Sequence, residues 1–507
     1  MPPRDRASDQ GKRPAAVWVR AEATRLVPIA VAAVTVALIV IHHLPQIAAF
    51  WAAMLRWPYP MQGSESLVVW EAQRLAQGES IYVANGPTQH GFVSGPYTPL
   101  YFAAVATTLK LSSTVYTGGR LITLVAWVAL LIMGGALAYG AGATTRRVRW
   151  LGAAVAVANL AAFTPGIIWA VRVKPTIPAL ALAACGLLIV QRTWSSPRQM
   201  YLWALVPLVA AYFTKQTALA APLAATLFLL TRAGWRVAAR FVGVGIIGGL
   251  VPFGLLTMLT RGEFFRHIVA DRRLAWQPQL VLNFGGLFSR DYWPLLLAAV
   301  LAALALLRWR TPSIAPLYLL CATAFVVTIG VEGADHDHLI ELAFAAAAAV
   351  GTGLAVALGR TSSARLLAWP IVALLILQVG TGWTPDRWYA GEYAQLDPRI
   401  RQQLDLIVTN VRHTPGEVLA EEIGLIILAG KPVPYDDPQA MAALARIGRW
   451  DQQQLLDDLN ARRFALVILP ANPRDELWTP EVLAAIAANY DLKFRDVWFT
   501  YEAKPRR

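Results

Sequence analysis

The sequence has 507 residues, of which 56% are hydrophobic and only 15% are charged, and its mean hydropathy is +0.47. Because soluble globular proteins carry about 25% charged residues, this composition excludes a disordered chain, a coiled coil and an ordinary soluble enzyme. The net charge of +14 is typical of nucleic-acid binding, but the positions of the charges, given below, argue against such a partner. The two cysteines, Cys185 and Cys321, lie in apolar runs and indicate neither a disulfide framework nor a zinc motif.

Apolar stretches follow one another along most of the chain. A helix needs about 20 apolar residues to cross a bilayer, and eleven stretches come near that length. A further segment, 97–112, is short and carries Lys110, so we expect it to lie along the membrane or to be re-entrant. Two of the eleven are also short, and we expect them either to tilt or to form a re-entrant pair: 200–213 and 217–231. The predicted spans are 26–48, 119–141, 150–168, 175–191, 200–213, 217–231, 241–260, 292–307, 313–331, 338–358 and 364–383.

Arginine marks one side of these spans. With a cytoplasmic N-terminus, and with 97–112 not counted as a span, the inward loops hold twelve arginines and no acidic residue. The positive-inside rule therefore predicts that the N-terminus lies in the cytoplasm and the C-terminus outside. Most of the net charge then faces anionic lipid, and no nucleic-acid partner is expected. These arginines are Arg146, Arg147, Arg149, Arg192, Arg198, Arg232, Arg236, Arg240, Arg308, Arg310, Arg360 and Arg365.

The outward segments are unequal, since the first outer loop (49–118) and the loop 261–291 are long. The chain is thus predicted to consist of a cytoplasmic basic tail, a transmembrane domain and an extracytoplasmic domain, over residues 1–25, 26–383 and 384–507. The last is expected to be a small α/β domain that acts as a lid or contacts the acceptor. Its predicted strands are 416–422, 464–470 and the stretch near the end, 491–505, and its predicted helices are 399–412, 438–446, 451–462 and 480–489.

Ionisable residues gather at the predicted outer ends of the spans. Such residues are costly at membrane depth and therefore indicate function. A carboxylate there can act as a general base, and fixed cations can bind a phosphate, so the set suits an anionic lipid-linked substrate. The residues are Glu65 and Glu71 after the first span, Arg120, Arg172, Lys174, Lys215, and the cluster Glu332, Asp335, His336, Asp337, His338 and Glu341.

Each of these residues also has a structural interpretation. Glu65 could cap the helix that begins beside it, where Ser64 and Ser66 are also good capping residues. Glu71 fits the polar face of an amphipathic helix, with Arg74 beside it.

The cations and the histidine cluster have alternatives of the same kind. Arg172, Lys174 and Lys215 could extend to the membrane interface from span ends. Asp335, Asp337 and His338 are residue types that bind metals, but their spacing is a weak metal signal. We therefore expect that no metal and no other cofactor is bound.

Several short stretches resemble the GT-C superfamily of polytopic glycosyltransferases, and most closely its branch of protein O-mannosyltransferases and lipid A aminoarabinose transferases. The resemblance covers roughly residues 20–385 and implies a mainly α polytopic bundle of about eleven transmembrane helices with an appended extracytoplasmic α/β domain. The matching stretches are GSESLVVWEAQRLAQGESIY (63–82), GPYTPLYFAAVATTLKL (95–111), TGGRLITL (117–124), RVKPTIPAL (172–180), TKQTALAAP (214–222) and GADHDHLIEL (333–342).

The resemblance also implies a reaction. A polyprenyl-phosphate-linked sugar would be transferred with inversion to an acceptor hydroxyl, on a glycan, lipid or protein, at the outer face of the cell membrane. Glu65 matches the acidic residue that acts as base on the acceptor. The positions that match donor-phosphate contacts are Arg172, Lys174 and Lys215, and further substrate contacts are expected from Tyr97, Arg120, His336 and His338.

Two other classes of protein are compatible with many spans. One is a lipid or solute transporter or flippase, and the other is a non-catalytic membrane assembly protein. A transporter needs neither the large loop 49–118 nor the domain 384–507, and its charges lie more often near the bilayer midplane. The charges at span ends favour chemistry on a lipid at the membrane surface.

Overall fold

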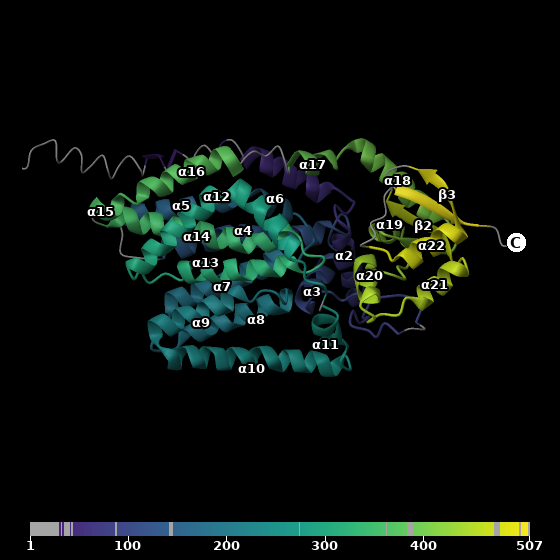
Figure 1. Cartoon of the computed structure of the whole chain (residues 1–507), viewed down its shortest axis with the longest axis horizontal. Helices are drawn as coiled ribbons and strands as arrows, with labels where there is room; N and C mark the ends of the chain where they lie inside the picture. The colour runs from purple at the N-terminus through teal and green to yellow at the C-terminus, as the bar shows by residue number, and fades with distance from the viewer. Residues whose placement is uncertain are drawn as a thin grey trace, which may run out of the picture.

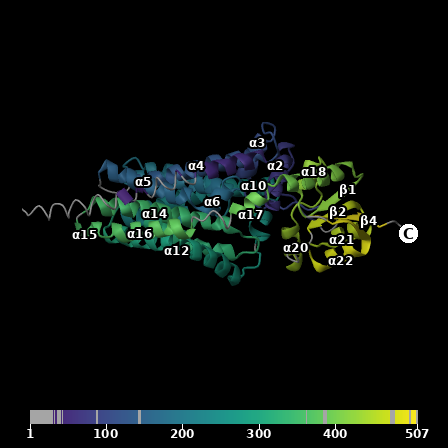
Figure 2. The same cartoon turned by 90° about the horizontal axis from the view of Figure 1, so that it is seen from above.

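The fold of the chain is a bundle of helices with a small mixed sheet at one end (Figures 1 and 2). A computed structural model describes residues 44–86, 89–140, 145–272, 274–360, 362–382, 389–470, 477–495 and 498–504, and five single positions between 30 and 41. The predicted tail 1–25 and most of the first predicted span lie outside the described residues, and residues 44–56 of that region are helical.

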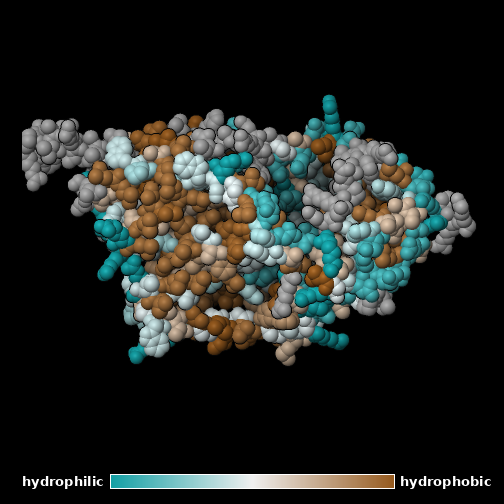
Figure 3. All heavy atoms as spheres, viewed as in Figure 1, coloured by the Kyte–Doolittle hydropathy of each residue, from teal (hydrophilic) through white to brown (hydrophobic). Residues whose placement is uncertain are grey.

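Five of the described helices are long and apolar enough to cross a membrane. The last of them, α14, begins directly after the cluster 335–338 and is buried in the bundle against α4, α5 (Arg146–Ala161) and α12. Figure 3 shows brown, apolar side chains over the helical part and teal, polar ones over the sheet end. The chain is therefore a multi-pass membrane protein. The five helices are α4 (Thr117–Tyr139), α7 (Thr176–Thr193), α10 (Trp235–Leu259), α12 (Pro278–Arg308) and α14 (Leu339–Gly359).

The alanine-rich sequence of α14 allows neighbouring helices to approach closely. A Cβ atom added to Gly152 in α5 (Arg146–Ala161) would lie 2.5 Å from the Gly351 carbonyl oxygen of α14. Only glycine fits at such a crossing, because any side chain would push the two backbones apart. Membrane helices commonly use such small residues where their backbones pack closely against each other.

The remaining predicted spans each coincide with shorter helices. The segment 97–112 forms α3 (Pro99–Thr108), whose ten residues are about half the length of a span. This agrees with the prediction that it does not cross. The shorter helices are α6 (Thr164–Trp169), η1 (Met200–Ala204), α8 (Leu205–Thr214), α9 (Ala220–Ala233), α13 (Ala315–Phe325), η3 (Val326–Gly330), α15 (Ser362–Arg365) and α16 (Ala368–Gly382).

The outer loop predicted over 261–291 is wrong in its second half, because α12 begins at Pro278. Polar residues in the first turns of this helix lower the local hydropathy, so an apolar window detects only its later part. The helix is kinked at Tyr292, where φ is −125° and ψ is 15°. Pro294 lies two residues further on, and a proline inside a helix removes a backbone hydrogen bond.

The C-terminal part contains the strands and helices that its sequence predicts. Its sheet has the order β1-β2-β4-β3, with β1 parallel to β2 and the other pairs antiparallel. The strands are β1 (Glu417–Ala420), β2 (Phe464–Pro470), β3 (Tyr490–Arg495) and β4 (Trp498–Ala503). The helices are α17 (Tyr389–Ala394), α18 (Pro398–His413), α19 (Gly424–Leu428), α20 (Pro438–Arg446), α21 (Gln453–Asn460) and α22 (Pro480–Asn489), of which α17 and α19 were not predicted.

The sheet end is held against the first outer loop. The backbone N–H of Phe92 donates to the Pro434 carbonyl at 2.8 Å. Gly91 has a φ of +102°, and a Cβ atom there would lie 2.6 Å from the same carbonyl oxygen, so this contact requires glycine. Helix α19 packs on α2 (Gly63–Ala76), which carries Glu65.

Glu422 lies in this contact and makes it sensitive to pH. Its carboxylate accepts a hydrogen bond from the Ser66 hydroxyl at 2.5 Å and one from the Gly424 N–H at 3.0 Å. The pKa of Glu422 is raised to about 7, mainly by burial; the two hydrogen bonds oppose the rise, and the nearby charges of Glu65 and Glu421 add to it. The docked state therefore binds the proton.

We expect the contact between α2 and α19 to be strongest below about pH 4.5 and to weaken as the pH rises through 7, since deprotonation leaves a buried charge. Hydrogen exchange of the amides of α2 and α19, measured between pH 5 and 8, would check this. Glu422→Gln should remove the pH dependence, whereas Glu502→Gln, on an exposed position of β4, should keep it. Exchange rates in α2 that change equally with pH in both variants, after correction for intrinsic exchange, would contradict this role of Glu422.

Candidate active site

Glu65 lies in the first turn of α2 and is fully buried. Its Oε2 accepts the N–H of Met61 at 2.8 Å, which satisfies a donor just ahead of the helix. Its Oε1 accepts the N–H of Val173 at 2.8 Å, in the turn between α6 and α7. Glu65 therefore does fasten the helix start, as its structural interpretation predicted, and it also joins two elements that are far apart in the sequence.

Arg120, at the start of α4, is completely committed to protein groups. Its Nε and Nη2 donate to the two oxygens of Glu65 at 3.3 and 3.2 Å. A guanidinium has five N–H donors, and all five are used here, so none is left for a phosphate oxygen. The other three donate to the carbonyls of Met54 at 2.8 Å, Trp57 at 2.7 Å and Tyr59 at 2.7 Å.

Arg172 is buried to nearly the same degree as Arg120, but fewer of its N–H groups donate hydrogen bonds. Its Nη2 donates to Glu392 in α17. Its Nη1 lies 3.8 Å from the Oε2 of Glu65 and is a buried donor with no hydrogen-bond partner among the described residues. An unsatisfied buried N–H is costly, so it marks a place where a ligand oxygen would be accepted.

The two arginines keep Glu65 charged. Burial by itself raises the pKa of this carboxyl group, but Arg120 and Arg172 outweigh that effect, and the net pKa is lower than usual. At neutral pH the group is therefore an ionised carboxylate with two cations beside it.

A second cluster lies around Lys215, which follows α8. Its ammonium group donates to Thr176 Oγ1 at 2.7 Å and to Asp337 Oδ2 at 2.9 Å, and Thr176 also donates to Asp337. Lys174 lies with its ammonium 5.6 Å from the centre of the Trp169 ring. Burial lowers the pKa of Lys174, but Tyr97 and the nearby acidic groups outweigh it, so the net pKa is raised and the group stays protonated.

The residues Asp335, His336 and His338 lie next to the Lys215 cluster. His336 Nδ1 is 2.7 Å from Asp335 Oδ1, and Asp335 accepts a hydrogen bond from Gln62 at 3.3 Å. His338 Nδ1 is 3.2 Å from the Thr328 hydroxyl. His338 lines a cavity of about 30 Å³ together with Lys215, Asp337 and Glu341, which is room for water but not for a sugar.

The predicted site residues therefore converge. Arg172 and Lys174 come from one short turn and reach the two clusters, Arg172 beside Glu65 and Lys174 near Asp337. Gln62, three residues before Glu65, contacts Asp335 of the histidine cluster. Glu65 and the later cations thus lie close together at one boundary of the bundle, as a shared site requires.

Asp335, Asp337 and His338, the residues considered above as possible metal ligands, do not face a common point. No group of three or more His, Cys, Asp or Glu side chains in the described ranges is placed to hold a metal ion. Asp337 faces the ammonium of Lys215, while Asp335 and His338 turn to different partners. An ammonium group in direct contact with the central carboxylate opposes binding of a second cation there.

The prediction for Glu71 is wrong. The sequence pattern assigns it to the polar face of an amphipathic helix with Arg74, but Glu71 is fully buried and accepts the Gly95 N–H at 2.6 Å. Arg74 pairs instead with Glu79. The helix α2 is covered on this side by the segment around Gly95, which sequence periodicity does not reveal.

Two functional candidates were not predicted from the sequence. Glu392 was not singled out, because the contact with Arg172 joins residues 220 positions apart. Thr176 is an ordinary residue at a helix start, and only its contact with Lys215 and Asp337 gives it a role. A signal for Glu392 is its place just after the last apolar stretch, near the membrane boundary.

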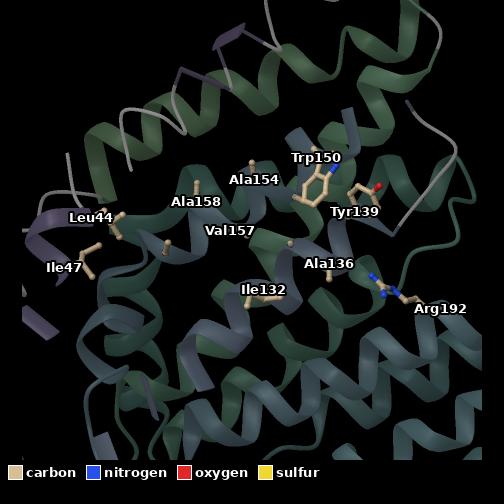
Figure 4. A pocket seen from close by; sticks show the side chains of 13 residues that line it. Leu44, Ile47, Ile132, Ala136, Tyr139, Trp150, Ala154, Val157, Ala158 and Arg192 are labelled. Carbon is tan, nitrogen blue, oxygen red and sulfur yellow. The ribbon is translucent and has the colours of Figure 1, made fainter. Parts of the chain in front are cut away.

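A larger cavity lies elsewhere, on the side of α4 and α5 (Figure 4). Its volume is about 640 Å³ and its walls are almost entirely apolar. Of the described residues that line it, only Arg192 is charged, and it lies near Tyr139 and Trp150, while Leu44 and Ile47 lie toward the other end. These walls suit lipid chains and hold no carboxylate from the described residues, so this cavity lacks the acidic groups that the smaller, polar region contains.

No protein-family model matches this chain, and no curated protein sequence matches it either. Solved structures do match. The structure of ArnT from Cupriavidus metallidurans bound to undecaprenyl phosphate aligns with a TM-score of 0.60 and 13% identity, over 92% of this chain and 99% of that one. The chain has the fold of ArnT. The apo structure of the same ArnT gives a TM-score of 0.59 at 13% identity, over 97% and 100% of the two chains.

The likeness to ArnT confirms the predicted resemblance at the level of fold. It covers nearly the full length of both chains, so it includes the helical bundle and the sheet end together. At 13% identity the fold is what the two proteins share, and the chemistry has to be argued from the residues of this chain.

Proposed function

We propose that this chain is a membrane glycosyltransferase that moves a sugar from a polyprenyl-phosphate donor to an acceptor hydroxyl on a glycan, lipid or protein. In this proposal the site lies at the outer face of a bacterial cell membrane, with the N-terminus in the cytoplasm and residues 384–507 outside. The observation that carries the proposal is the buried Arg172, with its unpartnered Nη1 beside the carboxylate of Glu65. The ArnT fold supports it, because ArnT is solved with undecaprenyl phosphate bound.

The cations divide into two roles. Arg172, Lys174 and Lys215 would bind the donor phosphate, Arg172 through its available N–H groups and the lysines as point charges. Arg120 would act as a positioning residue, because its five donors are occupied by Glu65 and backbone carbonyls. It holds Glu65 in place and does not touch the substrate.

Other residues of the same region would contact the sugar or the acceptor. Tyr97 lies beside Lys174, His338 lines the small cavity, and His336 stands on the same turn. Their ring nitrogens and hydroxyl group are suited to hydrogen bonds with sugar hydroxyls. No metal is required, since fixed cations already face the position of the phosphate.

The chemistry is a single displacement. Glu65 would take the proton from the acceptor hydroxyl while the acceptor oxygen attacks the anomeric carbon. The bond from that carbon to the phosphate oxygen breaks, and the polyprenyl phosphate leaves with the bonding electrons. Cations fixed in a poorly solvated site stabilise the charge that develops on the leaving phosphate. One displacement inverts the anomeric configuration.

The test is transfer by the purified protein in vesicles that contain a series of polyprenyl-phosphate sugars. We expect labelled sugar to reach an acceptor, and Arg172→Ala to reduce transfer at least about 100-fold, because a buried ligand of the phosphate is lost. Arg290→Ala, at an exposed ion pair, is the matched control and should leave transfer unchanged.

A transporter or flippase would give a different result in the same vesicles. The labelled lipid would change leaflets with no new glycosidic bond, and Arg172→Ala would alter that movement. Neither transfer nor movement, with undecaprenyl phosphate still bound, would favour the non-catalytic assembly protein. Either outcome would overturn the proposed transferase.

A further inference from the structure

The guanidinium of Arg172 is occupied in this structure by a carboxylate from the C-terminal side of the bundle. Glu392 lies in α17, which follows α16 in the chain and precedes the C-terminal sheet, and it accepts a hydrogen bond from Arg172 Nη2. Arg172 is only 2% exposed and Glu392 occupies its Nη2, so a phosphate can pair with both nitrogens only if Glu392 is displaced. Helix α17 packs against α6, close to the turn that carries Arg172 (Figure 1).

A carboxylate and a phosphate compete for the same partner. Both offer oxygen atoms that a guanidinium binds through paired N–H groups. A donor phosphate at Arg172 would bring further negative charge next to Glu65 and Glu392, with Asp335 also close enough to affect Glu392. Like charges this close disfavour one another, so a phosphate bound at Nη1 of Arg172 would weaken the contact between Nη2 and Glu392.

Helix α17 is suited to release this contact. It has only six residues, and Gly391 and Ala394 within it are exposed. A Cβ atom added to Gly391 would meet no neighbour within 4 Å among the described residues. After the helix, Leu396 is half-buried against the apolar clusters of the outer loop. A helix this short, with these two exposed positions, can open at low cost while Leu396 keeps its far end attached.

We propose that Glu392 is an internal competitor for the donor phosphate, and that α17 must move away from Arg172 before a polyprenyl phosphate can bind. This inference rests on the proposed function, since it concerns the same Arg172 site. The small cavity at Lys215 supports it, because about 30 Å³ admits water but no sugar, so binding of a donor requires part of the surroundings to move. The closed contact also excludes water from the cations when no donor is present.

The test compares binding of undecaprenyl phosphate to the full-length protein in nanodiscs. Glu392→Gln keeps the size of the side chain but removes its charge, so we expect binding to tighten about tenfold, by the loss of a competing ion pair. When Arg172→Ala is also present, Glu392→Gln should no longer change the affinity, because the contested guanidinium is gone. Glu79→Gln, at an exposed ion pair with Arg74, is the control and should bind as the wild type does.

The outcomes separate this inference from the proposed function. Equal affinities of the wild type and Glu392→Gln, with sugar transfer intact, would overturn the competition and leave the transferase standing. Absence of both binding and transfer in all variants would overturn both proposals. If Glu392→Gln unfolds, the shorter carboxylate of Glu392→Asp serves instead, since it should also bind tighter than the wild type, and unchanged binding would again overturn the competition.

Discussion

Glu65→Gln is expected to lower sugar transfer by a factor of about 10² to 10⁴, which is the usual contribution of a general base. Glutamine retains the shape of the side chain and can still accept hydrogen bonds from Arg120 and the Val173 N–H. The variant should therefore remain folded and embedded in the membrane. The measurement is kcat and KM for transfer from the donor found in the screen, with Glu79→Gln as an exposed control.

The pH profile adds an independent readout of Glu65. Because Arg120 and Arg172 lower its pKa, the carboxylate remains ionised throughout the neutral range. Wild-type kcat/KM should then have no loss from this group between about pH 5 and 8, because even an unperturbed glutamate carboxyl has a pKa of only about 4.3. If Glu65 only positions Arg172, the variant should raise the KM for the donor and keep kcat near the wild-type value. Wild-type kcat and KM together in Glu65→Gln would remove the residue from the mechanism.

Arg120→Met is expected to produce the largest loss of stability, about 3–5 kcal/mol, because it leaves a buried carboxylate without its main partner. The variant also leaves the carbonyls of Met54, Trp57 and Tyr59 without a donor. Thermal or denaturant unfolding in detergent, compared with wild type, measures the effect. Arg290→Met changes an exposed ion pair and should be nearly neutral.

A double variant separates the charge effect from the lost packing. Arg120→Met combined with Glu65→Gln removes both members of the buried pair, so no uncompensated charge remains. Its stability should exceed that of Arg120→Met alone, and the coupling energy follows from the double-mutant cycle. If the losses of unfolding free energy in the two single variants add up to that of the double variant, the coupling energy is zero. That result would contradict a stabilising ion pair between Arg120 and Glu65.

The sequence predicted the helices and strands well where the signal is local. Each predicted span from 119 onward contains a helix, and the strands at Glu417–Ala420 and Phe464–Pro470 lie within the predicted stretches. Hydropathy and strand alternation are carried by consecutive residues, so they can be read without the fold. The first half of α12 was missed, because polar residues on a helix at the membrane boundary cancel the hydropathy on which the prediction depended.

The sequence selected many of the residues that meet in the candidate site, but it predicted neither their pairing nor the contacts of Glu392 and Thr176. Residues such as Arg172, Lys215 and His338 were selected because ionisable groups at span ends are costly. Their partners could not be predicted: Lys215 and Asp337 are 122 positions apart, and Glu65 and Val173 are 108 apart. Such contacts depend on how helices pack, which a single sequence does not encode in any local pattern.

Arg120 and Arg172 illustrate the division between sequence and structure. The sequence by itself determined the membrane bundle, the asymmetry of its charge and the set of ionisable residues at one boundary, because composition and periodicity are local properties. In sequence the two arginines look alike, since each stands at a span end among apolar residues. Only the tertiary structure decided that all five N–H donors of Arg120 are occupied, whereas Arg172 donates to Glu392 through Nη2 and keeps Nη1 unpartnered near Glu65. The physical reason is that hydrogen-bond saturation depends on which backbone and carboxylate oxygens the fold brings within about 3.5 Å.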